Sequence, residues 1–319
     1  MQRVLTCVVL ATVAVISCSC GSTTGVKTKT KVDTAQRPVA QDATKEELLE
    51  KYNHIALNVK TVNMTVQLKP TAGSKYSGVI DEYHEVKAFL LAARPGKIRM
   101  IGQAPVIGTT VFDMASDGTT FHVSIPSKNK FLVGPVAVER ASNKPIENLR
   151  PQHLVDALLW NEIRKQETVL FEEFNDEIGR YYVLTVLRGG YQTEILRKVW
   201  FDRANLEVSR LQNFGPRGVL LSDVHVSDWQ PLEAGISGAA DAAANGAPAA
   251  PRPVAAFPRA IRIERPHDDY RLDLLIQKVS LNEEVPAARF KLEQPAGAEL
   301  VEVNDDGEEK KPVKDSSKP

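Results

Sequence analysis

The feature that most constrains this sequence is a run of short alternating apolar segments between residues 85 and 134. Groups of turn-forming residues separate the segments: Arg-Pro-Gly at 94–96, Gln-Ala-Pro at 103–105, Asp-Gly at 117–118 and Ser-Lys-Asn at 127–129. An Asp-Gly pair between alternating apolar runs is a strong hairpin signal. The stretch therefore predicts an antiparallel meander of short strands.

The Asp-Gly pair also predicts a register for its hairpin. If residues 117–118 form a two-residue loop, Met114 faces Phe121 and Phe112 faces Val123. Side chains alternate between the two faces of a strand, so these four residues share one face. Two strands that choose the same apolar face across a turn support each other.

Other segments alternate in the same way, at 85–92, at 97–104 and, near the C-terminus, at 269–280. Their apolar positions include Leu90, Met100, Tyr270, Leu272 and Leu274. Charged residues such as Lys87, Arg99 and Asp273 occupy the alternate positions. This pattern is typical of an antiparallel sheet with one buried face.

Two helices are expected beside these strands. The first begins with a capping box at 44–47 and continues with Leu48, Tyr52 and Ile55 at helical spacing. The second covers 149–160, with a proline in its first turn. Further strands are predicted at 167–173, 180–188, 194–202, 205–213, 218–229 and 258–264. The fold class is therefore α+β, mainly β, in one large domain.

The N-terminus has the form of a secretion signal. An apolar run from Val4 to Ile16 is too short to span a bilayer as a mature helix. The residues before Cys18 resemble a bacterial lipobox, which implies processing before Cys18 and acylation of that residue. Cys20 fits this pattern less well. The alternative is an ordinary secreted protein with an unrelated cysteine.

Composition divides the rest of the chain. We expect a signal peptide at 1–17, the lipidated cysteine and a disordered polar tether at 18–43, and a folded domain at 44–302. An Ala/Gly/Pro-rich flexible insertion interrupts the domain at 233–253, and a charged disordered tail covers 303–319. All three cysteines lie in the first twenty residues, which predicts a folded domain without disulfides or thiolate metal sites.

Charge and motifs exclude several functions. Forty basic and forty acidic residues cancel, so no electrostatic footprint predicts a nucleic-acid partner. The sequence lacks the serine-hydrolase, zinc-protease and phosphate-loop motifs, and we expect neither an enzyme nor a cofactor. The polar stretch 264–269 is interpreted as a turn, with a metal site as the less favoured alternative. The aromatic pairs at 181–182 and 200–201 are interpreted as sheet packing.

Four motifs carry a resemblance to a known family. They are RPGKIR at 94–99, SDGTTF at 116–121, IPSKNK at 125–130 and the closing ARFKLEQPAGAELV at 288–301. Their order and spacing resemble the lipoprotein-carrier superfamily of the periplasmic carrier LolA and the outer-membrane receptor LolB. The lipobox favours the LolB-like side. The insertion at 233–253 and the charged tail depart from both.

The resemblance implies an unclosed β half-barrel whose concave apolar face is covered by helices and binds acyl chains. The candidate groove residues are Leu90, Met100, Phe112, Met114, Phe121, Val123, Tyr270, Leu272 and Leu274. The partners implied are membrane lipids through Cys18, acyl chains of lipid or lipoprotein cargo, and a periplasmic carrier. The location implied is the outer membrane, facing the periplasm. The alternative is a cell-envelope scaffold of the same fold with a filled groove.

Overall fold

The computed structural model describes residues 38–74, 78–137, 150–190, 193–232 and 254–303. Its strands are β1 Thr61–Ser74, β2 Val79–Glu82, β3 Val86–Ala93, β4 Lys97–Gln103, β5 Thr110–Ser116, β6 Thr120–Ile125, β7 Lys130–Pro135, β8 Thr168–Asn175, β9 Arg180–Arg188, β10 Glu194–Asp202, β11 Glu207–Phe214, β12 Leu220–Pro231, β13 Ala256–Arg265, β14 Tyr270–Leu281 and β15 Glu299–Glu302. The α-helices in these ranges are α2 Lys45–Asn58 and α3 Pro151–Leu158.

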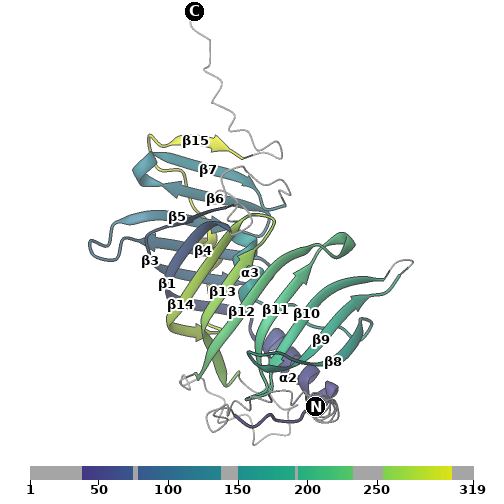
Figure 1. Ribbon diagram of the computed structural model, residues 1–319. Helices are drawn as coiled ribbons and strands as arrows, with labels where there is room; N and C mark the ends of the chain where they lie inside the picture. Colours follow the sequence, from purple (N-terminus) through teal and green to yellow (C-terminus); the bar gives the residue numbers. More distant parts are fainter. Residues whose placement is uncertain (1–37, 75–77, 138–149, 191–192, 233–253, 304–319) are drawn as a thin grey trace, which may run out of the picture. The chain divides into compact units, whose positions relative to one another are not determined.

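The strands of the described residues form one open sheet, in the order β15-β7-β6-β5-β4-β3-β1-β14-β13-β12-β11-β10-β9-β8 (Figure 1), with β2 paired to β1 beside this path. The two ends, β15 and β8, do not pair with each other. Neighbouring strands are antiparallel except β7 and β15, which run parallel. The predicted α+β class with an unclosed half-barrel is therefore confirmed.

Helix α2 begins as the sequence predicts. The Thr44 hydroxyl accepts a hydrogen bond from the Glu47 backbone N–H, and the Glu47 carboxylate accepts one from the Thr44 backbone N–H, which completes the capping box. Leu48, Tyr52 and Ile55 form its buried stripe. Helix α3 begins at Pro151, which lies where a missing N–H costs no helical hydrogen bond.

The main core lies between these helices and one face of the sheet. Strand β4 shows how its alternating side chains contribute to this core. Ile98 and Met100 are fully buried, whereas Lys97, Arg99 and Ile101, which point to the other face, are partly exposed. Fully buried side chains of this core include Leu48, Tyr52, Leu68, Leu90, Ile98, Met100, Leu154, Leu184, Ile263, Leu272 and Leu274. Burying each such aliphatic side chain contributes about 1.5–3 kcal/mol.

The predicted register of the β5–β6 hairpin is wrong by two residues. Met114 pairs with Val123, and Ser116 pairs with Phe121, so the loop has four residues, 117–120, in place of two. The Asp117 carboxylate accepts hydrogen bonds from the backbone N–H groups of Thr119 and Thr120, which stabilises the longer loop. Because the shift is even, the apolar side chains keep their shared face.

The expected signal peptide, Cys18, the insertion at 233–253, residues 19–37 of the tether and residues 304–319 of the tail lie outside the described residues. The last residues before α2 contact the sheet, since the Gln41 N–H donates to the Arg203 carbonyl and Asp42 forms an ion pair with the Arg203 guanidinium at 2.8 Å. Among the described helices, none has the length and hydrophobicity required to cross a bilayer.

Candidate functional site

All nine predicted groove residues lie on the sheet face that the helices cover. Five of them, Leu90, Met100, Met114, Leu272 and Leu274, belong to the main core. Phe112 and Val123 are partly buried and pack against that core. Phe121 and Tyr270 are buried nearer its margin, where they meet residues of α3 and of the segment before it.

Two of these aromatic rings lie over glycines of neighbouring strands. A Cβ atom at Gly102 would come within 2.3 Å of the Phe112 ring, and one at Gly134 within 2.9 Å of the Phe121 ring. The glycines therefore leave the space that the rings occupy. The Arg150 guanidinium lies over the Phe121 ring, 5.6 Å from its centroid.

A network of hydrogen bonds joins α2 to residues 159–163, the segment after α3. We call α2, α3 and this segment the cover. The Tyr52 hydroxyl donates to the Asn161 carbonyl at 2.8 Å, and its ring stacks on Trp160 at 5.7 Å. Asn53 exchanges two hydrogen bonds with the backbone of Ile163. The cover is therefore one connected layer.

Arg94 attaches this cover to the sheet from the β3–β4 turn. Its guanidinium donates to the carbonyls of Ala56 at 2.8 Å, Val59 at 3.1 Å and Trp160. One side chain thus holds the C-terminal end of α2 and the segment after α3. Partial burial lowers the pKa of Arg94.

A pocket of about 260 Å³ opens on this face of the sheet, between the cover and strands β10 to β13. Its polar residues include His153 and Asp156 of α3 and Arg265 at the end of β13. The Asp156 carboxylate accepts from the Gln152 amide at 2.9 Å. The Arg265 Nε donates to the Asp268 carboxylate at 2.6 Å.

The rest of the pocket lining contains a second cation, Arg197 of β10, and an apolar part. Trp160 of the cover and Leu196 of β10 contribute to the apolar part, with Leu211 and Phe214 of β11 and Leu221 of β12. Leu211 is buried, whereas Leu221 is 37% exposed. The pocket therefore combines opposite charges with an apolar wall that reaches solvent, which suits an amphiphilic ligand.

Burial changes the ionisation of the groups in this pocket. It lowers the pKa of His153 from 6.5 to about 3, so the imidazole is neutral at pH 7. It raises the pKa of the Asp156 carboxyl, although the Gln152 amide and Arg265 act in the opposite direction. Burial also raises the pKa of the Tyr270 phenol.

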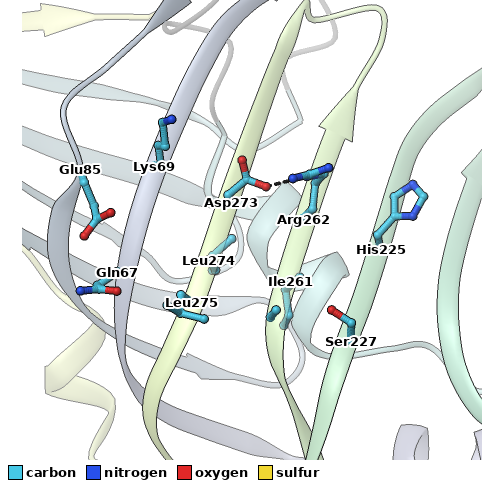
Figure 2. Close-up of a pocket in the computed structure, with 11 residues that line it drawn as sticks. Gln67, Lys69, Glu85, His225, Ser227, Ile261, Arg262, Asp273, Leu274 and Leu275 are labelled. Carbon is cyan, nitrogen blue, oxygen red and sulfur yellow. Dashed lines mark hydrogen bonds and ion pairs between the residues drawn. The ribbon is translucent and has the colours of Figure 1, made fainter. Parts of the chain in front are cut away.

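A larger depression, of about 460 Å³, lies on the opposite face of the sheet. Figure 2 shows its polar side chains on the adjacent strands β1, β14, β13 and β12, including Lys69, Asp273, Arg262 and His225. Arg262 and Asp273 are paired there at 2.6 Å, and Lys69 pairs with Glu82 at 2.8 Å. Because these charges already satisfy one another, we place the candidate site at the smaller pocket.

In the polar stretch 264–269, the first two residues end β13 and residues 266–269 form the turn to β14, closed by the hydrogen bond from the Asp268 N–H to the Arg265 carbonyl. The described residues contain no cluster of three His, Cys, Asp or Glu side chains arranged to hold a metal ion. Both aromatic pairs pack on the sheet: Tyr181 and Trp200 meet edge to face at 5.7 Å, while Tyr182 and Phe201 are buried.

Sequence analysis missed the charged residues of the pocket, although Arg265 carried a signal. Asp156 carried none, because it lies outside the apolar stripe of the helix predicted at 149–160 and is exposed. Arg265 follows Ile261 and Ile263 at the period-two spacing of residues that face the core. A charge at a core-facing position is unusual enough to indicate a functional or structural role.

Comparisons with protein-family models and with curated proteins give no match. Among solved structures, the chain is similar to a LolA superfamily protein from Nitrosomonas europaea, with a TM-score of 0.45, 13% identity, and coverage of 79% of this chain and 99% of that chain. It is also similar to a putative outer membrane lipoprotein-sorting protein domain from Vibrio parahaemolyticus, with a TM-score of 0.43, 11% identity, and coverage of 77% of this chain and 97% of that chain.

A third similar structure is a DUF1329 family protein from Desulfovibrio piger, with a TM-score of 0.41, 11% identity, and coverage of 77% of this chain and 95% of that chain. At these identities the similarity concerns the fold alone. One of these structures is named for the LolA superfamily, the family that the motifs of this chain resemble.

Proposed function

We propose that this protein is an envelope lipoprotein that binds acyl chains of lipid or lipoprotein cargo on the helix-covered face of its sheet, for transport to or insertion into the outer membrane. The observation that carries this proposal is the extent of that face. Buried apolar residues continue from Met114 on β5 to Leu184 on β9, in one core with the buried residues of the cover. The hydrocarbon of a ligand can take the place of the cover on such a face, since each methylene that it buries stabilises binding by about 0.8 kcal/mol.

The volume of the pocket determines how much of a ligand it can hold before the cover has to move. A space of about 260 Å³ is smaller than the roughly 300–1,000 Å³ that holds a drug-sized ligand. It therefore accepts a head group or one chain end, and whole acyl chains require the cover to separate from the sheet. The hydrogen bonds of Arg94 oppose this separation, as do those of Arg197 to the carbonyls of Asn161 and Glu162.

Membrane contact is assigned to two places in the chain. Acylated Cys18 provides the anchor, because several acyl chains hold a protein on a bilayer far longer than one. The β4–β5 hairpin offers a second contact, since Val106 and Ile107 at its tip are 95% and 77% exposed. Exposed apolar side chains at a loop tip are suited to the bilayer interface.

The test is lipid extraction and native mass spectrometry of the protein purified without residues 1–18, together with displacement of a fluorescent fatty acid. Co-purifying acyl lipid and saturable probe binding are expected. Absence of both would leave the alternative, a scaffold lipoprotein with a filled groove, which the full burial of Met100 and Leu272 favours. For the anchor, Cys18→Ala is expected to move the protein from the membrane fraction to the soluble fraction.

A further inference from the structure

The sheet ends at β8, at the other end from β15 (Figure 1), and among the described residues no strand pairs with the outer edge of β8. Such an edge presents unpaired backbone N–H and C=O groups to any extended chain. Proteins usually protect it with a very short strand, a lysine, a proline or a bulge. Strand β15 follows this rule, since it has four residues and a glutamate at each end.

Strand β8 lacks these protections. It has eight residues, contains neither lysine nor proline, and pairs with β9 without a bulge. Leu170, Phe171 and Phe174 are exposed, on both faces of the strand. Phe171 packs on Tyr182 at 5.1 Å, and Phe174 meets Trp200 edge to face at 5.2 Å. An open edge with apolar side chains on both faces is suited to receive one more strand.

The charges of β8 select the strand that fits this edge. Glu172 and Glu173 lie in the middle of β8, and Asp176 and Glu177 follow in the connection to β9. A second copy of β8 would bring the same carboxylates together, and like charges opposite each other destabilise a strand pair. The edge therefore fits a strand that carries basic residues.

The N-terminal part of this chain contains such a strand in its sequence. Residues 26–32 read Val-Lys-Thr-Lys-Thr-Lys-Val and lie outside the described residues. Valine and threonine are favoured in strands. The period-two spacing puts the three lysines on one face and the valines and threonines on the other. This pattern predicts a seven-residue strand, close to β8 in length.

The described residues that follow this segment lie beside β8. Asp42 and Glu173 of β8 bind the same guanidinium, that of Arg203. Residues 33–41, which connect residues 26–32 to this contact, span roughly 30 Å when extended. The eight residues of β8 are roughly 26 Å long. The segment can therefore reach every part of the edge.

We propose that residues 26–32 add to the outer edge of β8 as one more strand, with the lysines on the face of Glu172. Phe171 lies opposite Leu184 of the main core, so it points to the helix-covered face, and Glu172 points to the other. The valines and threonines then continue the helix-covered face beside Phe171. The proposal concerns a surface away from the cargo site and does not depend on what the protein carries.

The lysine side chains fit the outer face in two ways. Their methylenes cover the exposed Leu170 and Phe174, while their ammonium groups reach the carboxylate of Glu172. The added strand leaves residues 19–25 between Cys18 and the sheet, a span of at most roughly 25 Å. With Cys18 acylated as proposed above, this short connection would hold the β8 end of the domain close to the bilayer.

The experiment uses the full chain with Cys18→Ala. Hydrogen exchange measured by mass spectrometry is expected to show amides of residues 26–32 exchanging about tenfold or more slowly than in the free peptide of the same sequence. A carbodiimide, which joins an amine to a carboxylate in direct contact, is expected to link a lysine of this segment to Glu172 within one chain.

Variants assign the protection to the pairing of charges. Changing Lys27, Lys29 and Lys31 together to Glu is expected to remove the slow exchange and the cross-link. Glu172→Lys alone should also release the segment, and combined with the three lysine changes it should restore slow exchange. The matched control changes Lys310, Lys311 and Lys314 of the tail to Glu, which alters the net charge equally and should leave residues 26–32 protected.

Three results would overturn the proposal. The first is exchange of residues 26–32 in the parent chain at the rate of the free peptide. The second is equal loss of protection in the tail control, which would indicate a general effect of net charge. The third is cross-links found only between two chains, which would assign the edge to a second copy. Binding of the fluorescent fatty acid should be the same in all these variants, so none of these results bears on the proposed function.

Discussion

The imidazole of His153 on α3 and the hydroxyl of Tyr270 on β14 share a hydrogen bond of 2.6 Å, and their rings lie 6.1 Å apart. Strand β14 lies between β1 and β13. The contact therefore attaches the cover to the central strands of the sheet. Tyr270 is buried and His153 is half-buried, and this environment favours the neutral imidazole.

The first prediction is that His153 makes the fold sensitive to acid. Burial lowers the pKa of His153 from 6.5 to about 3, so below pH 6.5 the unfolded chain binds a proton that the folded chain does not. The free energy of unfolding should then fall as the pH decreases from 6.5 towards 3, by at most about 1.4 kcal/mol per pH unit.

Urea denaturation of the parent chain and of His153→Gln at several pH values measures this effect. Above pH 6.5 the variant is expected to be the less stable of the two, because it loses the contact with Tyr270. The difference should narrow as the pH falls. A difference that stays constant between pH 6.5 and 4 would contradict the prediction.

The second prediction concerns Arg94 as the attachment of the cover. Arg94→Leu leaves the carbonyls of Ala56, Val59 and Trp160 without this donor, which is expected to lower the free energy of unfolding by about 1–3 kcal/mol. Because the cover then opens more often, the fluorescent fatty acid should associate faster in stopped-flow measurements.

The matched control for this change is Arg188→Leu, which removes an exposed arginine paired with Glu194. It is expected to change stability by no more than about 0.5 kcal/mol and to leave the association rate unchanged. If Arg94→Leu destabilises the protein but the probe enters at the parent rate, Arg94 holds the fold together without controlling access.

Local patterns predict most of this fold because they depend on neighbouring residues. The capping box at Thr44 and Glu47 fixes the start of α2, and period-two alternation identifies the buried face of β14 through Leu272 and Leu274. The register of the β5–β6 hairpin was not predictable in this way. It depends on the side chain of Asp117, which favours a loop two residues longer than the Asp-Gly pair suggests.

The last strand and the site required contacts that are distant in sequence. Strand β15 pairs with β7, which places Val301 beside Leu132, more than 160 residues earlier. The pocket likewise joins Asp156 to Arg265 across five intervening strands of the chain order, β8 to β12. Arg265 alone interrupts the apolar pattern of its strand, Asp156 is an exposed helix residue, and only the fold brings both to the lining of one pocket.

The third prediction concerns the tip of the β4–β5 hairpin. The loop is closed by hydrogen bonds between Ala104 and the backbone of Gly108 and Thr109, so its exposed residues do not support the core. The double change Val106→Ser with Ile107→Ser is expected to leave stability within about 0.5 kcal/mol. It should weaken binding of the Cys18→Ala chain to phospholipid vesicles by about tenfold or more, since burying each side chain is worth about 1.5–3 kcal/mol.

The control for that experiment is Ile178→Ser, which removes an equally exposed apolar side chain from the β8–β9 turn, at 88% exposure. Vesicle co-sedimentation should be unchanged by it. Equal losses in the two variants would indicate general hydrophobic adhesion in place of a specific membrane contact.

The last prediction tests whether the helix-covered face is the face that binds cargo. Met100 is fully buried, with Leu90 and Met114 as its cross-strand neighbours. Met100→Trp therefore overfills the closed core and is expected to cost about 1–3 kcal/mol of stability. Val123→Trp, at a partly buried margin position, should cost less.

The decisive comparison is with Val183→Trp, because Val183 is also buried but on the opposite face of the sheet, beside Trp200 of β10. Met100→Trp and Val183→Trp should destabilise the protein to a similar extent, because both positions are buried. If acyl chains occupy the helix-covered face once the cover has moved, Met100→Trp should also abolish binding of the fluorescent fatty acid, whereas Val183→Trp should retain it. Probe binding that survives Met100→Trp would assign the cargo to another surface and leave this face as a core.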